Sequence, residues 1–245
     1  MPTNLSVNLN AVAMLRNRRD LPWPSVTGIG ALALQAGAHG LTVHPRPDER
    51  HIRASDVFDL KALIERDWAG KEFNIEGYPD ERFMGLIREV RPHQVTLVPD
   101  DPSQATSDHG WAFEADGAFL KPLIQELKEG GARVSLFVDA APMAAKMAAD
   151  VGADRVEIYT GPYGVLTAPS DISRMLDVIQ AVFDEACAAG IEVNAGHDLT
   201  LDNLPALMAK VPGIAECSIG HGLTADCLLF GVEGAVQRYL AALGH

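Results

Sequence analysis

A short run of β-branched and apolar residues recurs eight times along this chain, and each run is followed by a stretch of helical character. The runs are LSVNLN (5–10), GLTVHP (40–45), EFNIEG (72–77), QVTLVP (94–99), RVSLFVD (133–139), RVEIYTG (155–161), EVNAGH (192–197) and ECSIGH (216–221). Strands that alternate with helices build parallel sheets, and eight alternations in 245 residues are typical of a sheet closed into a barrel. The sequence therefore predicts an α/β fold, a single (β/α)8 TIM barrel over residues 1–245.

Two segments are longer than a minimal barrel requires. Residues 100–116, DDPSQATSDHGWAFEAD, follow the fourth run and are polar and rich in turn residues. A loop of this length is uncommon unless it covers or binds a ligand, so we expect a lid there. Residues 46–70 are expected to hold an extra helix at Asp56–Glu65. The alternative fold is an open doubly wound sheet, although the G-x-G-x-x-G turn usual after its first strand is missing.

Composition limits where the chain works and what it binds. Hydrophobic residues make up 47% of it, enough for a substantial core, yet no apolar run approaches the roughly 20 residues that span a bilayer. The N-terminal residues lack the order of a secretory signal, and the three cysteines form no C-x-x-C pair. We therefore expect a cytoplasmic protein with reduced thiols. A net charge of −13 argues against nucleic acid or an anionic membrane as a partner.

Polar side chains gather where the strands are expected to end, which is where a barrel of this kind places its reactive groups. The strand ends carry Asn8, Asn10, His44, Glu76, Asp139, Glu157, Thr160, His197 and His221. Histidine titrates near neutral pH, and burial can raise a glutamate into the same range, so the set favours acid–base catalysis. Each histidine taken alone is better explained as a hydrogen-bonded structural residue, and only the set favours function.

Other chemistries remain open for the same residues. His44, Glu76, His197 and His221 are ligand types that suit Zn²⁺ or Fe²⁺, although no H-x-H pair is present, and we expect neither a metal nor an organic cofactor. No lysine ends a strand and no G-x-S-x-G motif occurs, which disfavours Schiff-base and serine chemistry.

Phosphate is the ligand that the basic residues and glycines favour. The basic residues up to position 53 are all arginines, and guanidinium matches phosphate bidentately. In the eighth run Gly220 and Gly222 allow close backbone approach, before a last helix expected to begin at Thr224 or Asp226. The simpler alternative is that the arginines are solvated surface residues.

The segments VNLNAVAMLRNRR, LTVHPRPDERHI, FNIEG, TLVPDDPSQATSDHG, VSLFVD, YTGPYG, VNAGHDLT and SIGHG occur in the order found in the pyridoxine 5′-phosphate synthase family. The chain resembles this family over nearly its whole length. The resemblance implies a cofactor-free (β/α)8 barrel with additional helices that assembles as a homo-octamer. It also implies the reaction, in which 3-amino-2-oxopropyl phosphate and 1-deoxy-D-xylulose 5-phosphate condense and release inorganic phosphate and water.

The resemblance also implies roles for individual residues. His44 and Glu76 would accept protons and His197 would donate one. The deoxyxylulose phosphate would contact Arg46, His51 and Thr106, and the aminooxopropyl phosphate would be held by Asn8, Arg19, Gly220 and His221.

Three departures from the family pattern bear on binding. Asn10 and Ala11 stand where the family often has Asp-His, Asp198 stands where it has Gly, and the residues after I-G-H differ from its usual apolar run. We keep Asn10 and Asp198 among the expected substrate-binding residues and interpret the chain as a divergent, active member. The alternatives are a metal-dependent lyase or isomerase acting on a small phosphorylated substrate, and a regulator that binds phosphometabolites without turnover.

Overall fold

The computed structural model describes residues 2–100, 104 and 106–245, and its strands form a closed parallel barrel in chain order. The barrel closes where β1 pairs with β8. The strands are β1 (Asn4–Asn8), β2 (Gly40–Val43), β3 (Glu72–Gly77), β4 (Gln94–Leu97), β5 (Arg133–Val138), β6 (Arg155–Tyr159), β7 (Glu192–Gly196) and β8 (Glu216–Ile219). The predicted barrel is confirmed, and each strand begins within one residue of its predicted start.

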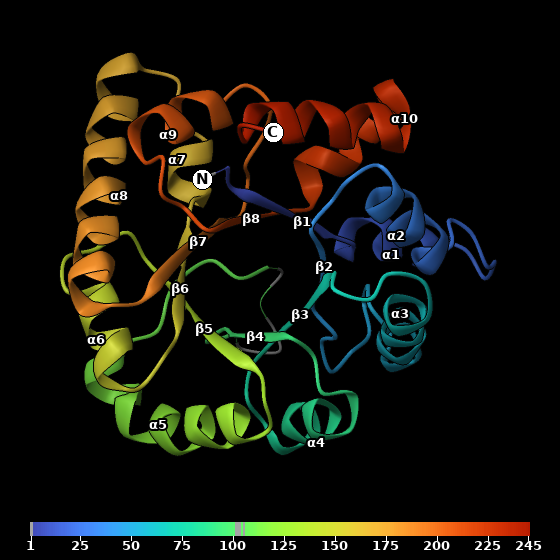
Figure 1. The fold of residues 1–245 in the computed structure, drawn as a ribbon, viewed down its shortest axis with the longest axis horizontal. Coiled ribbons are helices and arrows are strands. Elements are labelled where there is room, and N and C mark those ends of the chain that lie inside the picture. The colour runs from blue at the N-terminus through green and yellow to red at the C-terminus, as the bar shows by residue number, and fades with distance from the viewer. Residues whose placement is uncertain (1, 101–103, 105) are drawn as a thin grey trace.

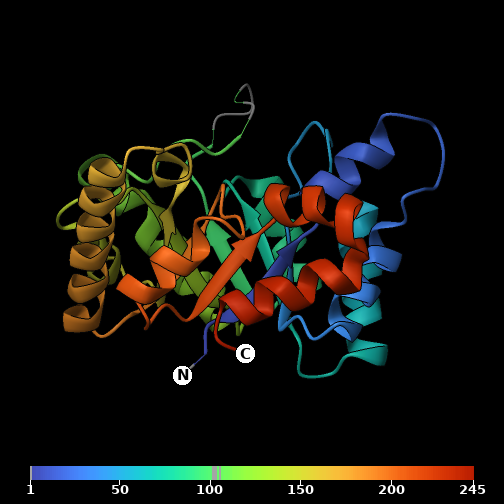
Figure 2. The same ribbon diagram turned by 90° about the horizontal axis from the view of Figure 1, so that it is seen from above.

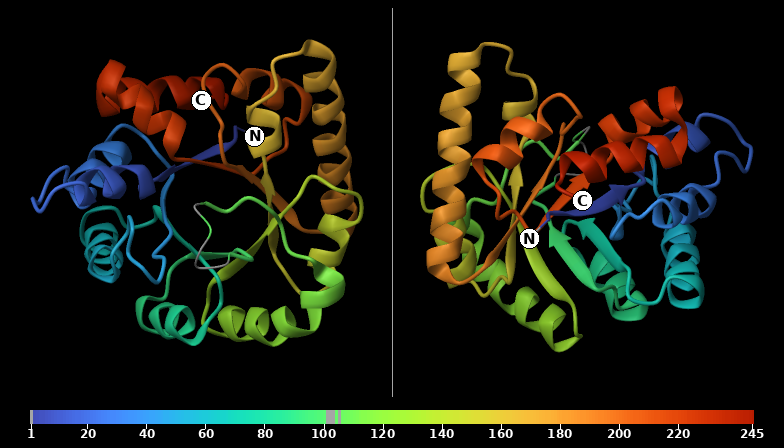
Figure 3. Two further views of the ribbon diagram at one scale, coloured as in Figure 1. Left: turned by 180° about the vertical axis from the view of Figure 1, so that it is seen from behind. Right: turned by 45° about the horizontal axis from the view of Figure 1, so that its top comes forward.

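A ring of helices surrounds the barrel, as Figures 1 and 3 show from opposite sides. The helices that follow successive strands are α2 (Val26–Gln35), α3 (Ala54–Asp67), α4 (Glu81–Val90), α5 (Phe113–Glu129), α6 (Ala144–Asp150), α8 (Pro169–Ala189), α9 (Leu204–Lys210) and α10 (His221–Ala242). Two further helices, α1 (Asn10–Asn17) and α7 (Gly161–Gly164), are the additions to the basic plan.

The helix predicted at Asp56–Glu65 is present as part of α3, but it is not an extra helix, because α3 is the ordinary connection between β2 and β3. Val57, Leu60 and Ile64 recur at helical spacing and are buried, so this helix packs on the barrel like its neighbours. Asp56 fixes the start of α3 by accepting a hydrogen bond from the Arg53 backbone N–H at 2.8 Å.

The inside of the barrel is polar, whereas the apolar core lies between the strands and the helices. Ser6 and Thr42 share a hydrogen bond of 2.7 Å, Asn74 donates to Thr42 at 3.3 Å, and Thr96 donates to Asn74 at 3.1 Å. Barrels of this class usually fill this space with branched apolar side chains. Further buried polar residues on the strands are Gln94, Ser135, Glu157, Asn194, Glu216 and Ser218.

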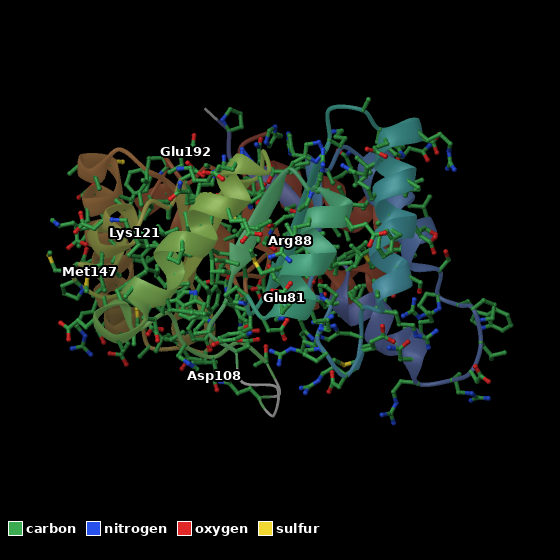
Figure 4. All side chains as sticks on the ribbon, turned by 90° about the horizontal axis from the view of Figure 1, so that it is seen from below. Glu81, Arg88, Asp108, Lys121, Met147 and Glu192 are labelled. Atoms are coloured by element: carbon green, nitrogen blue, oxygen red, sulfur yellow. The ribbon has the colours of Figure 1, made fainter. Side chains whose placement is uncertain are left out.

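The two ends of the barrel differ in what they carry. Both termini lie on the side opposite the loop that follows β4, as Figure 2 shows. In Figure 4 Asp108 of that loop and Glu192, which begins β7, likewise lie at opposite ends. The loop end is therefore the carboxyl-terminal mouth. No helix among the described residues has the length and apolar character that a bilayer-spanning segment requires.

The loop after β4 is shorter than expected, because Phe113 already begins α5. Its far end is fixed to the barrel: the Trp111 indole N–H donates to the Leu97 carbonyl at 2.8 Å. A Cβ at Gly110 would come within 2.3 Å of the Asp139 backbone nitrogen, so the loop backbone lies directly on the end of β5. The residues from Gly110 onward are thus an anchored part of the barrel wall.

Candidate active site

Neighbouring strands bring five of the predicted residues together at the mouth. Asn8, which ends β1, donates from its amide to Glu76 Oε2 at 3.4 Å and accepts from the Asn10 backbone N–H at 2.9 Å. Asn10 Oδ1 accepts from the His44 backbone N–H at 2.9 Å. Gly220 lies so close that a Cβ there would be 3.2 Å from Asn8. Asn10 is the first residue of α1 and not a strand end, and its side chain contacts the His44 backbone.

His44 is buried directly after β2, with its ring centre 6.0 Å from that of His51. Burial, followed by the charge of Arg46, holds the pKa of His44 well below its ordinary value. Burial and the same arginine lower the pKa of His51 to about 4. Both rings are therefore neutral at physiological pH, the form in which an imidazole accepts a proton.

Glu76 on β3 contributes a carboxyl group to this part of the mouth. Burial, followed by the negative charge of Asp100, raises its pKa to about 7. Deeper in the barrel, burial and the charge of Glu76 raise the pKa of Glu157 well above its ordinary value. Glu157 is accommodated by Gly196, where a Cβ would come within 2.2 Å of its Oε1.

Asp100 is a residue of the site that the sequence analysis missed. Its buried carboxylate pairs with Arg46, accepts from the Ser107 hydroxyl at 2.9 Å and lies 3.8 Å from His44 Nε2. Arg46 also donates to the Gln104 carbonyl at 3.0 Å. The position of Asp100 just after β4 could have identified it as a site residue, but the polar loop sequence around it obscured that signal.

A pocket opens beside this ion pair. Its wall includes two arginines and an aromatic ring, and its lining residues are His44, Pro45, Arg46, Pro47, Gly77, Tyr78, Asp80, Arg82 and Asp100. Arg82 reaches it from α4 and donates to the Pro45 carbonyl at 2.7 Å. Of the amino-terminal arginines, Arg16 is not available to a ligand, because it is buried against both carboxylate oxygens of Asp56.

His197 directly follows β7 and is held from several sides. Its Nε2 lies 2.9 Å from the Thr106 hydroxyl, and its Nδ1 lies 3.0 Å from Asp198 Oδ2. The ring of Tyr159 meets it edge-on, with ring centres 5.0 Å apart. Thr106 thus contacts a predicted catalytic residue, and no contact of its side chain with Arg46 or His51 is seen in the described part of the chain.

Two predicted residues lie apart from these contacts. His221 is exposed and begins α10, so this helix starts earlier than the expected Thr224 or Asp226. Arg19 is exposed just beyond α1. Within residues 2–100, 104 and 106–245, no side-chain hydrogen bond or ion pair joins either of them to the other predicted residues. Among those same residues, no three His, Cys, Asp or Glu side chains form a group that could hold a metal ion.

Comparisons with known proteins find relatives that match over nearly the whole chain. The family model described as "Pyridoxal phosphate biosynthesis protein PdxJ" matches residues 5–245. The chain is 62% identical over 245 residues to the pyridoxine 5′-phosphate synthase of Mesorhizobium japonicum, covering 100% of both chains. It is 60% identical over 244 residues to the Brucella anthropi protein of that name, covering 99% of this chain and 100% of the relative.

A comparison of folds finds more distant barrels. A mutant tryptophan synthase α-subunit from Pyrococcus furiosus matches with a TM-score of 0.63 at 12% identity, covering 100% of this chain and 98% of that chain. At this identity the match concerns the fold alone.

Proposed function

The chain belongs to the PdxJ family of pyridoxal phosphate biosynthesis proteins, and from that premise we propose how its residues carry the reaction. It catalyses the ring closure that forms pyridoxine 5′-phosphate in vitamin B6 biosynthesis. The amine of 3-amino-2-oxopropyl phosphate attacks the ketone of 1-deoxy-D-xylulose 5-phosphate, and the ketone oxygen leaves as water when the imine forms. Expulsion of inorganic phosphate, closure of a carbon–carbon bond and further loss of water then complete the ring. Each step moves protons, which positioned His and Glu side chains transfer.

We assign proton acceptance to His44 and Glu76. The observation that carries the assignment is that burial shifts their pKa values in opposite directions. It lowers the pKa of His44, which stays neutral, and raises the pKa of Glu76 to about 7. A neutral imidazole and a carboxylate of near-neutral pKa are both suited to remove protons at physiological pH. His197, across the mouth and directly after β7, is the proposed proton donor.

The two phosphate groups are assigned to two different sets of residues at the mouth. Arg46, with His51 nearby, is proposed to hold the deoxyxylulose phosphate, which requires that the phosphate replace Asp100 as the partner of Arg46. The aminooxopropyl phosphate is assigned to Asn8, Gly220 and His221. The free backbone N–H groups at the start of α10 support this assignment, because they attract anions. Arg19 and Thr106 keep their proposed substrate contacts.

The test is an assay of the purified protein with both phosphorylated substrates, following pyridoxine 5′-phosphate and inorganic phosphate. We expect both products, and we expect activity to survive exhaustive chelation. Loss of activity on chelation, restored by one transition metal per chain, would favour the metal-dependent alternative. Binding of both substrates without any product would favour the regulator.

We also propose that the chain assembles with copies of itself, as the family resemblance implies. Leu228 and Leu229 on α10 are 80% and 75% exposed, and Trp23 before α2 is 62% exposed. α10 packs against both α1 and α2, so these apolar side chains belong to one side of the molecule. Exposed apolar groups so numerous are typical of an interface.

Replacing Leu228 and Leu229 together with Glu is expected to reduce the assembly size, since two charges would be buried at the contact. Light scattering after size-exclusion chromatography measures it. Val178→Glu, on the distant helix α8, is the control and should leave the assembly intact. An unchanged mass for the double variant would remove these residues from the interface.

A further inference from the structure

Asp198 lies where it fixes which nitrogen of His197 carries a proton. Its Oδ2 is 3.0 Å from His197 Nδ1. A carboxylate only accepts hydrogen bonds, so Nδ1 is the protonated nitrogen, and in the neutral ring Nε2 is left as an acceptor. Nε2 faces Thr106, whose hydroxyl then donates to it across 2.9 Å. The reactive nitrogen of His197 is therefore the one directed away from Asp198.

The backbone holds this pair in a conformation that side chains seldom adopt. His197 has a φ of 83° and Asp198 a φ of 56°, both in the left-handed region. Neighbouring polar groups hold the turn: Thr160 donates to the His197 carbonyl at 2.6 Å, and Asn203 donates to the Asp198 carbonyl at 2.9 Å. Such strain persists where the surroundings impose it, and it is concentrated at functional sites.

The carboxylate of Asp198 is directed at the His197 imidazole, which is its ion-pair partner among the described residues. In that part of the chain, no lysine or arginine forms an ion pair with Asp198. Space for its side chain comes from Gly164, where a Cβ would lie 2.8 Å from the Cβ of Asp198. Its charge is also felt by Tyr159, whose pKa is raised first by burial and then by Asp198.

We propose that Asp198 is a positioning residue that orients His197 and stabilises the imidazolium formed when Nε2 takes up a proton. His197 then donates the proton acquired at Nε2, while the proton on Nδ1 stays in the hydrogen bond to Asp198. A carboxylate behind a catalytic histidine acts in this way in other enzymes. The inference rests on the proposed function, because it needs His197 to transfer protons. It replaces the expectation that Asp198 contacts substrate.

Kinetics of two variants separate positioning from substrate contact. Asp198→Gly suits the positive φ and removes the carboxylate, so kcat should fall by roughly 10-fold or more while KM for each substrate changes less than about twofold. Asp198→Asn also tolerates this backbone and keeps an oxygen that accepts from Nδ1, so it should recover part of kcat. Asp202→Asn, an exposed carboxylate in the same loop, is the control and should match the unmodified enzyme.

A raised KM for aminooxopropyl phosphate with unchanged kcat would instead make Asp198 a substrate contact, and unchanged kinetics would remove it from the site. A second readout does not depend on turnover. In protein labelled with ¹⁵N-histidine, the His197 signals, identified by their loss in His197→Asn, should show Nδ1–H in the unmodified chain and shift towards Nε2–H in Asp198→Gly. An Nε2–H ring in the unmodified chain would overturn the inference. Absence of turnover with this tautomer intact would overturn the proposed function alone.

Discussion

At the scale of single residues, burial has opposite consequences for the two proposed proton acceptors. Leaving water disfavours the charged form of either group, so the pKa of the His44 imidazole falls while that of the Glu76 carboxyl rises to about 7. His44 is consequently in its accepting form across the physiological range. Glu76 reaches its accepting form only when the pH exceeds its own pKa, and Glu76 therefore sets the pH dependence of the reaction.

The first residue-scale prediction follows from the sign of that shift. Glu76 accepts a proton only when ionised, so kcat/KM should fall as the pH is lowered through about 7. Glu76→Gln should lower turnover roughly 100-fold or more and abolish this dependence while substrate binding changes little.

Asp100→Asn provides the matched test of the cause. It removes the negative charge that raises the pKa of Glu76, so the fall in kcat/KM should move to lower pH. A pH profile identical in all three proteins would show that another group titrates.

Residues at strand ends were predictable because the alternation of the strands fixes where each one stops. Asn8, His44, Glu76 and His197 were identified in this way, and the structure places all four at the mouth. Asp100 was not identified as a site residue, since its importance arises from a partner, Arg46, on a different strand end. A contact between residues 54 positions apart leaves no local pattern in the sequence.

At the scale of elements, the loop after β4 links the two halves of the proposed site. Asp100 and Gln104 contact Arg46 beside β2, whereas Thr106 contacts His197 beyond β7. A ligand that takes the place of Asp100 at Arg46 therefore acts on the same segment that carries Thr106 to His197. Ser107, next to Thr106, donates to Asp100 at 2.9 Å, so we expect substrate at Arg46 to affect the surroundings of the proton donor.

We predict that deoxyxylulose phosphate contacts Thr106 and that aminooxopropyl phosphate does not. Hydrogen exchange with each substrate separately should show protection of peptides containing Thr106 only with the former. Thr106→Ala should weaken the binding of deoxyxylulose phosphate by about 1–3 kcal/mol if a buried phosphate oxygen loses its partner. Thr106→Ser keeps the hydroxyl and should bind normally. Equal protection by both substrates, or by neither, would contradict the assignment of Thr106.

Elements were predicted better where their ends are chemically marked. β3 matches its predicted range, since Gly77 ends an alternating run. Glycines with positive φ separate four helices from the strands that follow them: Gly37, Gly131, Gly152 and Gly190. The last helix was placed too late because Gly220 caps it without any side-chain hydrogen bond. The loop was drawn too long because Phe113 begins α5 within a stretch of polar residues.

At the scale of the whole molecule, the polar barrel interior couples stability to pH. Glu216 lies inside the barrel and accepts from Asn194 at 3.4 Å. Burial, followed by the charge of Glu72, raises its pKa to about 8. The folded state therefore holds a proton that the unfolded chain releases above about pH 4.5, so this group stabilises the fold at low pH and loses that effect as the pH rises through about 8.

Glu216→Gln supplies a neutral side chain of the same shape at every pH. The variant should gain stability relative to the unmodified protein as the pH rises from 5 to 9, by on the order of 1–4 kcal/mol. Thermal unfolding followed across this pH range measures the difference. Glu89→Gln, at an exposed position on α4, is the control. Equal pH dependence for both variants would mean that the interior carboxyl is not responsible.

The hydrogen-bonded interior also has an evolutionary consequence. In an apolar core, one aliphatic side chain replaces another with modest loss, so positions drift independently. A hydrogen-bonded network joins Ser6, Thr42, Asn74 and Thr96. Replacing any one of them leaves a donor or acceptor of its neighbour without a partner. Substitutions there should accumulate slowly and as compensated pairs, even far from the mouth. Among distant members of the family, the helical ring should thus diverge first and the axis of the barrel last.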